Sequence, residues 1–356
     1  MAPNATTQIL LSPAELSYLH ASLSLSPPIR PDGRSPTQFR PLIAESDILP
    51  SPNGSARVCF ADGTEAIVGV KAEVHKSDAP VIGLLDPTEA GDDDEEIDEK
   101  PTGKGMGEDQ WVDMGIEVPG QRDDDPLPLF LAAMLTEALL ASGELKDRLW
   151  INRRFHWKLY IDVLLLSQPL SYPLPLLSLT THLALLDAKL PKLVSEGDED
   201  PLFDDDWEAS GYLYPLDSTG KRLDNPTITL LVISVGANII FDPSKEELAV
   251  ADAVLAVSIG VPTGSKGLQI LSMRTIDPPS KLTQPGVPTA LNSAAGATNV
   301  SEEEIIAARE TSTDQGVWNP PRGGLSRKLI PQIMKAVLGP NGVAKEVIDG
   351  LNAVTS

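Results

Sequence analysis

The chain has 356 residues, of which 41% are hydrophobic and only 4% aromatic, and its 51 Asp and Glu against 28 Lys and Arg give a formal net charge of −23. This length suffices for one large or two ordinary domains with an aliphatic core, and the charge argues against a protein that coats nucleic acid with a basic surface. The single cysteine, Cys59, excludes a disulfide framework and a four-cysteine zinc site. The single cysteine fits a reduced intracellular compartment, and no signal peptide or membrane span is recognisable.

The first half of the chain predicts helices alternating with strands. Residues 12–15, Ser-Pro-Ala-Glu, match a helix capping box with proline at the first helical position, so a short helix should follow. Residues 61–64, Ala-Asp-Gly-Thr, separate two β-rich runs and predict a hairpin loop. The expected elements are strands 55–60 and 65–73, helix 126–142, strand 155–166 and helix 174–190. Because the strand 155–166 is nearly all apolar after Lys158, it should be central and covered on both faces.

The second half predicts mainly strands. Residues 227–235 and 238–241 form a second hairpin, 268–274 another strand and 325–344 a terminal helix, whereas the apolar run 246–258 is ambiguous between helix and strand. This order of elements is typical of an α+β fold in which helices cover mixed sheets. We find no internal repeat and interpret residues 1–356 as a single domain with insertions.

The acidic residues are concentrated in two segments. Residues 76–125 hold 17 acids and 4 bases, residues 195–208 hold 8 acids and no base, and together they account for −21 of the net charge of −23. We interpret residues 76–110 as an acidic disordered insertion, since like charges repel and little there can pack. Residues 195–208 predict an acidic loop anchored by Phe203 and Trp207, with a partner-docking peptide as the less favoured alternative. Residues 278–324 have a low-complexity composition typical of a flexible insertion.

Tests for catalytic or metal chemistry in the sequence give nothing. The four histidines, at positions 20, 75, 156 and 182, are far apart and show no metal-ligand spacing, and His182 should be a packed residue of an apolar helix. There is no Gly-x-Ser-x-Gly motif, and residues 262–267 predict a turn rather than a phosphate loop. We therefore expect no cofactor and no metal.

Three stretches resemble the RNase PH family when they are taken in order. The first is Arg30-Pro31-Asp32-Gly33-Arg34 followed by Phe39-Arg40-Pro41, the second comprises residues 54–58 and 67–73, and the third is residues 158–166 with Asp162. The resemblance implies an RNase PH-like domain, built of two halves like ribosomal protein S5 domain 2. Residues 11–16, 120–124 and 190–193 are most similar to the ring subunits of the eukaryotic RNA exosome, and which of three closely related ring subunits fits best stays open.

The resemblance also indicates where catalytic residues would lie. In active members a strand ending in Asp-Val-Leu continues into Asp-Gly-Gly-Thr-Arg, which holds phosphate. Here Leu165, Leu166, Ser167 and Gln168 follow, and no Lys or Arg occurs between Lys158 and Lys189. Active members also carry Glu-Glu-Asp, five residues, and Asp-x-Asn, where this chain has Leu248 and Val254 in place of the aspartates. Because neither side chain can bind a metal or move a proton, the sequence predicts a non-catalytic ring subunit.

Two other functions stay open at this stage. One is an active phosphate-dependent 3′-to-5′ exoribonuclease, for which Asp252 would serve as a displaced acid. The other is a free-standing acidic adaptor on the same scaffold.

The resemblance implies protein partners, RNA and a location. The partners would be messenger RNA transport protein 3 as dimer mate, ribosomal RNA-processing proteins 41, 43, 45 and 46 in the ring, processing proteins 4 and 40 with a third protein as caps, and a hydrolytic nuclease. Single-stranded RNA would thread the ring, in nucleus, nucleolus and cytoplasm. The candidate RNA-binding residues are Arg153, Arg154 and Lys158. The slightly favoured alternative is that these side chains are only solvent-exposed residues at the start of the strand. Arg34 and Arg40 would pin the N-terminal segment to the sheet or to a neighbour.

Overall fold

The computed structural model describes residues 11–77, 107–122, 124–195, 197, 199–218, 220, 222–262, 267–283, 286, 318–321, 324–340 and 342–354. Its helices are α1 (Pro13–Leu23), α2 (Pro126–Leu140), α3 (Glu144–Arg148), α4 (Leu174–Asp187), α5 (Lys245–Leu248), α7 (Leu329–Leu338) and α8 (Val343–Asn352). Its strands are β1 (Leu42–Ser46), β2 (Gly54–Phe60), β3 (Glu65–Lys76), β4 (Val112–Glu117), β5 (Phe155–Leu165), β6 (Lys189–Leu190), β7 (Gly211–Tyr212), β8 (Ile228–Val235), β9 (Asn238–Phe241), β10 (Ala253–Gly260) and β11 (Gln269–Ile276). None of the helices in these ranges is suited to span a membrane.

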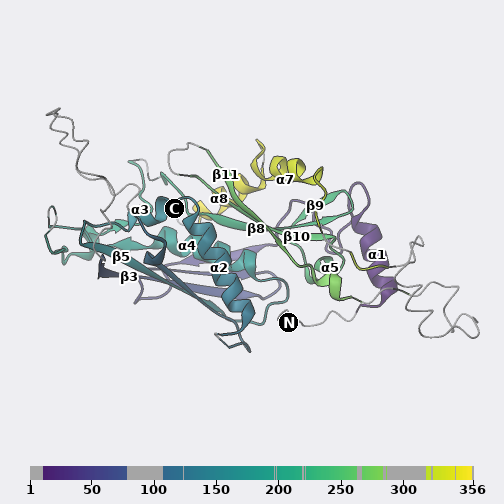
Figure 1. Cartoon of the computed structure of the whole chain (residues 1–356), viewed down its shortest axis with the longest axis horizontal. Coiled ribbons are helices and arrows are strands. Elements are labelled where there is room, and N and C mark those ends of the chain that lie inside the picture. Colours follow the sequence, from purple (N-terminus) through teal and green to yellow (C-terminus); the bar gives the residue numbers. More distant parts are fainter. Residues whose placement is uncertain are drawn as a thin grey trace, which may run out of the picture.

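Two larger sheets enclose a layer of helices. The first has five strands in the order β1-β2-β3-β5-β4, in which β4 runs parallel to β5 and the other neighbours are antiparallel. The second has four antiparallel strands in the order β11-β10-β8-β9. Figure 1 shows α2 and α4 between the strands of the two sheets. This arrangement is the expected α+β fold with helices covering mixed sheets.

Helix α4 is the centre of the core. It packs against β2 and β3 of the first sheet and against β8 of the second, and every residue from Leu174 to Leu186 is buried. A helix that is apolar on all sides needs partners on all sides, which the two sheets supply. His182 is fully buried here, so its prediction as a packed residue is confirmed.

The structure corrects or completes several predictions. Strand β4 was not predicted, although its residues alternate between buried and exposed. Strand β5 is central, but only one of its faces is covered, since Asp162 and Leu164 are exposed. The ambiguous run 246–258 holds the last turn of α5 and then β10. The expected terminal helix is two helices, because a chain turn at Gly339 and Gly342 separates α7 from α8.

The edges of the predicted insertions belong to the fold. The acidic insertion 76–110 lies mostly outside the described residues, but Lys76 ends β3 and Gln110 belongs to a short 3-10 turn before β4. Within 278–324, Ser280 and Trp318 are buried, and Trp318 stacks edge-on against His20 of α1. The loop 195–208 is anchored by Phe203, whose ring packs on Trp157, whereas Trp207 is exposed.

Gly54 offers a test of how closely α4 meets the first sheet. A Cβ atom at this position would lie 2.4 Å from Ala188 Cα and 2.6 Å from the Ala184 carbonyl oxygen. Because these are backbone atoms that cannot turn aside, we expect Gly54→Ala to lower the free energy of unfolding by about 3 kcal/mol. Gly211→Ala, where an added Cβ meets nothing within 4 Å, is the control. Urea denaturation of both variants measures the difference, and equal stabilities would contradict the expectation.

Candidate functional site

Arg30, the first arginine of the RNase PH-like motif, lies buried in the body of the fold. Its Nε donates to Glu247 Oε1 at 2.7 Å and its Nη2 to Glu247 Oε2 at 2.8 Å, which is a two-pronged ion pair. Its remaining N–H groups donate to carbonyl oxygens, among them that of Asp242 at 3.0 Å. Glu247 is equally buried and also forms a capping box with Ser244 at the start of α5. Arg30 thereby joins the N-terminal segment to the second sheet.

Asp242 follows β9 directly and is the second buried anion of this site. Its carboxylate accepts from Arg34 Nη1 at 2.9 Å, from Arg40 Nη2 at 2.7 Å and from the backbone N–H of Arg40 at 2.8 Å. The residue has a φ of +46°, a left-handed conformation that a non-glycine residue rarely adopts. The two guanidinium groups compensate a charge that would otherwise be costly to bury.

Arg40 extends this cluster toward the first sheet. Its Nη1 donates to Asp62 Oδ2 at 2.6 Å in the β2–β3 loop and to Ser171 Oγ at 2.9 Å in the loop before α4. Its guanidinium also lies 4.5 Å from the centre of the Phe60 ring. Burial would lower the pKa of Arg40, but the hydrogen bonds and charges of Asp242 and Asp62 outweigh it and raise that pKa. We call the set Arg30, Arg34, Arg40, Asp62, Asp242 and Glu247 the arginine–carboxylate cluster.

The other motif residues border this cluster or lie apart from it. Asp32 accepts from Arg34 Nε at 2.6 Å, and the bonds from Arg34 lower its pKa although partial burial opposes this. Gly33 has a φ of +75° in the turn between them, which favours glycine. Asp162 does not join the cluster, because it lies on the exposed face of β5.

The loop after β5 would hold phosphate in an active family member. Ser167 Oγ accepts the backbone N–H of Glu65 at 3.0 Å, while Leu166 and Leu170 expose their side chains. Arg40 is a cation close to this loop, because its Nη1 donates a hydrogen bond to Ser171 Oγ. That guanidinium already binds two carboxylates, so its charge is neutralised.

The positions expected for catalytic aspartates are packed apolar residues. Leu248 and Val254 are both buried in the core. Asp252, the possible displaced acid, accepts from Gly236 N–H at 2.6 Å and lies 3.3 Å from His20 Nε2. It therefore lies at the β8–β9 turn, whereas Asp242 lies at the opposite end of β9. Asp252 and the arginine–carboxylate cluster do not form one site.

The predicted RNA-binding group lies where the chain turns into β5. Arg154 forms an ion pair with Asp200 at 2.9 Å, and its guanidinium lies 5.3 Å from the Phe155 ring centre. Arg153 precedes it in the exposed turn, and Lys158 lies over the Tyr160 ring at 5.1 Å. The acidic loop thus already neutralises part of this basic group.

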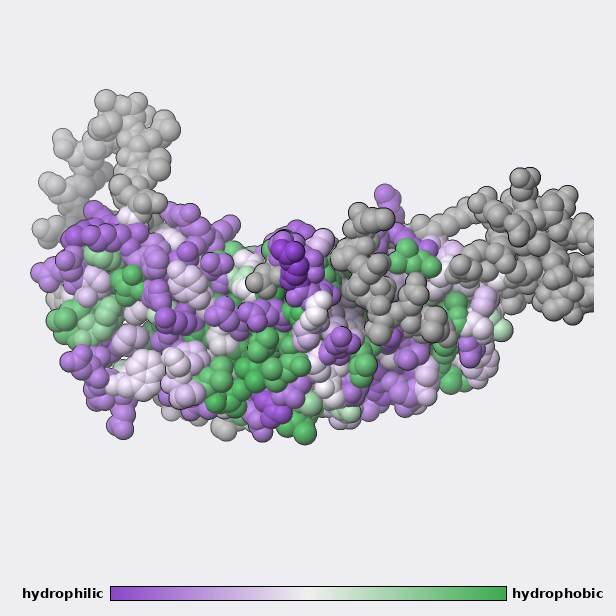
Figure 2. All heavy atoms as spheres, turned by 90° about the horizontal axis from the view of Figure 1, so that it is seen from below, coloured by the Kyte–Doolittle hydropathy of each residue, from purple (hydrophilic) through white to green (hydrophobic). Residues whose placement is uncertain are grey.

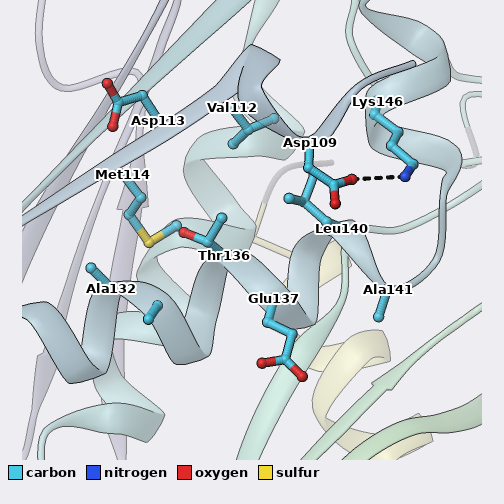
Figure 3. A pocket seen from close by; sticks show the side chains of 11 residues that line it. Asp109, Val112, Asp113, Met114, Ala132, Thr136, Glu137, Leu140, Ala141 and Lys146 are labelled. Atoms are coloured by element: carbon cyan, nitrogen blue, oxygen red, sulfur yellow. Dashed lines mark hydrogen bonds and ion pairs between the residues drawn. The ribbon is translucent and has the colours of Figure 1, made fainter. Parts of the chain in front are cut away.

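A hollow of about 570 Å³ separates β4 from α2. Figure 3 shows Asp109 and Lys146 joined at one end, at 2.8 Å, and Thr136 and Glu137 projecting from the helix. Glu137 is paired with Arg274 of β11. Across the described part of the chain, no group of three or more His, Cys, Asp or Glu side chains could hold a metal ion.

Sequence reasoning missed Asp62, Ser171 and Asp242 as members of the cluster. Each is an isolated polar residue in a turn or loop, and their separations from Arg40 of 22, 131 and 202 positions leave no local signal. Glu247 directly precedes Leu248 in the sequence, but its partner Arg30 is 217 positions away.

Comparison with known proteins identifies the family of this chain. Residues 38–191 match the model of the 3′ exoribonuclease family, domain 1 (RNase PH). The exosome complex component RRP42 of Saccharomyces cerevisiae is 33% identical, over 70% of this chain and 81% of that protein, and its namesake in Schizosaccharomyces pombe is 32% identical, over 70% and 78%. A chain of the Archaeoglobus fulgidus exosome with RNA bound aligns at 18% identity with a TM-score of 0.49, over 84% of this chain and 93% of that one, a likeness too distant to carry an argument. The chain belongs to the RNase PH family.

Proposed function

We propose that this chain is a non-catalytic structural subunit of the core ring of the RNA exosome, in which it supports 3′-to-5′ RNA processing and degradation by a separate nuclease. The observation that carries the proposal is the similarity to two curated relatives named exosome complex component, each matched over more than three quarters of its length. A ring of alternating subunits requires a heterologous interface that closes, so the partners would be the other ring subunits and the caps.

The chemistry of the candidate site supports a scaffold rather than an enzyme. A phosphate-dependent nuclease needs a free cation or amide cradle and carboxylates at the scissile bond. In this chain the loop after β5 offers exposed leucines, and Leu248 and Val254 are packed in the core. The arginines that could bind an anion are held by Asp62, Asp242 and Glu247. The arginine–carboxylate cluster would therefore hold the two sheets in the orientation that ring contacts require.

RNA contact and cellular location form the finer part of this proposal. Arg153, Arg154 and Lys158 would be the cations nearest to passing RNA, with Arg154 exchanging Asp200 for a phosphate. Messenger RNA transport protein 3 would be the dimer mate, and the complex would act in nucleus, nucleolus and cytoplasm.

Co-purification tests the ring assignment. The tagged chain is purified from its own cells, and the proteins that accompany it are identified and quantified by mass spectrometry. We expect the other ring and cap subunits at equal stoichiometry. Recovery of the chain alone or as a homohexamer would overturn the assignment.

Phosphorolysis is tested separately, on the chain purified without its partners. The isolated chain, given single-stranded RNA and inorganic phosphate, should release no nucleoside diphosphate. Release that disappears in an Asp252→Asn variant would instead establish the active exoribonuclease.

A further inference from the structure

The region between α3, the start of β5 and the acidic loop contains an aromatic pocket. Its volume is about 280 Å³, and its lining residues are Asp147, Trp150, Ile151, Trp157, Pro191, Leu193 and Phe203. The rings of Trp157 and Phe203 lie 4.9 Å apart at an angle of 41°, and Trp150 is partly exposed. Such a set of rings beside a carboxylate suits a cationic side chain, since ring faces attract positive charge.

The acidic loop forms one wall of this pocket and is held in place by its backbone. The N–H of Val194 donates to the Leu202 carbonyl at 2.8 Å, and that of Asp204 donates to the Lys192 carbonyl at 2.9 Å, which pairs residues 192–194 with residues 202–204 as the two arms of a hairpin. The side-chain amide of the buried Asn152 donates to the Glu199 carbonyl at 2.9 Å. We call residues 192–208 the acidic hairpin. Its position is thus set in part by hydrogen bonds that do not use its carboxylates, while Asp200 pairs with Arg154 and the carboxylates of Asp204 and Asp206 accept backbone N–H groups within the hairpin.

The surface of the acidic hairpin is both apolar and acidic. Leu202 is 63% exposed, Trp207 52% and Val194 52%. Between and around them stand carboxylates at positions 199, 200, 204, 205, 206 and 208. A hairpin that served only as a connection would gain nothing from exposed large apolar residues, whereas a docking surface for an amphipathic segment needs them.

We propose that the aromatic pocket and the acidic hairpin form a docking site for a cationic, amphipathic segment of a protein partner. An arginine or lysine side chain of that segment would stack in the pocket, and its apolar residues would cover Leu202 and Trp207. Charge complementarity selects this occupant, because the carboxylates of the acidic hairpin attract a basic peptide. The site does not depend on the ring assignment, and it lies at the end of the molecule where α3 is seen in Figure 1.

Peptide binding to the purified full-length chain tests this site. The probe is a fluorescein-labelled peptide of alternating arginine and leucine, and its affinity is followed by fluorescence anisotropy at low salt. The same peptide with citrulline in place of arginine keeps the shape but lacks the charge. We expect the citrulline peptide to bind about tenfold more weakly, since ring-face attraction and ion pairing both need the cation.

Two variants separate this site from general charge attraction. Replacing Asp204, Asp205 and Asp206 by asparagine should weaken binding of the arginine peptide about tenfold, because the peptide binds at the acidic hairpin itself. The matched control replaces Asp92, Asp93 and Asp94 in the same way, removing the same charge from the other acidic segment, and should change the affinity less than twofold. Phe203→Leu keeps an apolar side chain but removes the ring, and it should weaken binding about fivefold.

Several outcomes would overturn the docking site. Equal effects of the two triple variants would reduce the interaction to net charge. If single-stranded oligouridylate competes with the peptide for this surface, the ligand of the site would be RNA and not a protein segment. Self-association of the chain that Phe203→Leu abolishes would identify a second copy as the occupant.

Discussion

Asp242→Asn should be the most damaging single substitution in this chain, lowering the free energy of unfolding by about 3–5 kcal/mol. The carboxylate is fully buried and binds the guanidinium groups of Arg34 and Arg40. An asparagine has nearly the same shape but no charge, so Arg34 and Arg40 would lose their one fully buried anion and keep only the more exposed carboxylates of Asp32 and Asp62. Because whole domains are stable by only about 5–15 kcal/mol, much of the variant should be unfolded or aggregated at physiological temperature.

The control for this prediction is Asp32→Asn in the same cluster. Asp32 also binds Arg34, but its side chain is 37% exposed, so solvent screens the lost charge and we expect less than about 1 kcal/mol. Thermal and urea unfolding, followed by circular dichroism, give both values. Similar stabilities for the two variants would mean that the buried charge of Asp242 does not hold the segments together.

The second large effect concerns His182 and acid. Complete burial lowers the pKa of His182 to about 4, against a smaller opposing effect of backbone groups at Pro226 and Thr227. The unfolded chain should titrate this ring near its ordinary pKa of about 6.5. The neutral histidine therefore contributes its full stability above pH 6.5, and this is lost as the pH falls from 6.5 toward 4. The loss amounts to about 3 kcal/mol, from the difference between the two pKa values.

His182→Leu isolates this contribution from that of the many carboxylates. The leucine fills a similar apolar space in α4 and does not titrate. The measured quantity is the free energy of unfolding of the variant minus that of the natural chain. We expect this difference to increase by about 3 kcal/mol as the pH falls from 7 to 4. Unfolding in urea at several pH values measures this difference. A constant difference across that range would show that His182 can be protonated within the fold.

Local patterns in the sequence predicted most of the fold. The capping box at Ser12, the hairpin at residues 61–64 and the apolar helix that became α4 each depend on neighbours within a few positions. Strand β4 was missed although its alternation is local, because it follows directly on an acidic stretch that was interpreted as insertion. Strand β5 was predicted to be covered on both faces, but one face is exposed. The apolar content of a strand does not tell which face of the sheet packs against a helix.

Some features of the candidate site were likewise predictable from the sequence, and others were not. The absence of a cation after β5 and the apolar residues at positions 248 and 254 are facts of the sequence, and the prediction of a non-catalytic subunit rests on them. Tertiary structure decided that Arg40 lies beside Ser171 and binds Asp62 and Asp242. No pattern along the chain relates these residues, because they meet only when the two sheets close on α4.

By itself, the sequence determined the α+β class, the resemblance to the RNase PH family and the concentration of negative charge in two segments. Tertiary structure decided what these charges do. It buried Asp242 and Glu247 among arginines, and it placed the acidic hairpin beside Arg154 and an aromatic pocket. The physical reason is that helix and strand patterns depend on contacts along the chain, whereas the energy of a charge depends on which distant residues surround it.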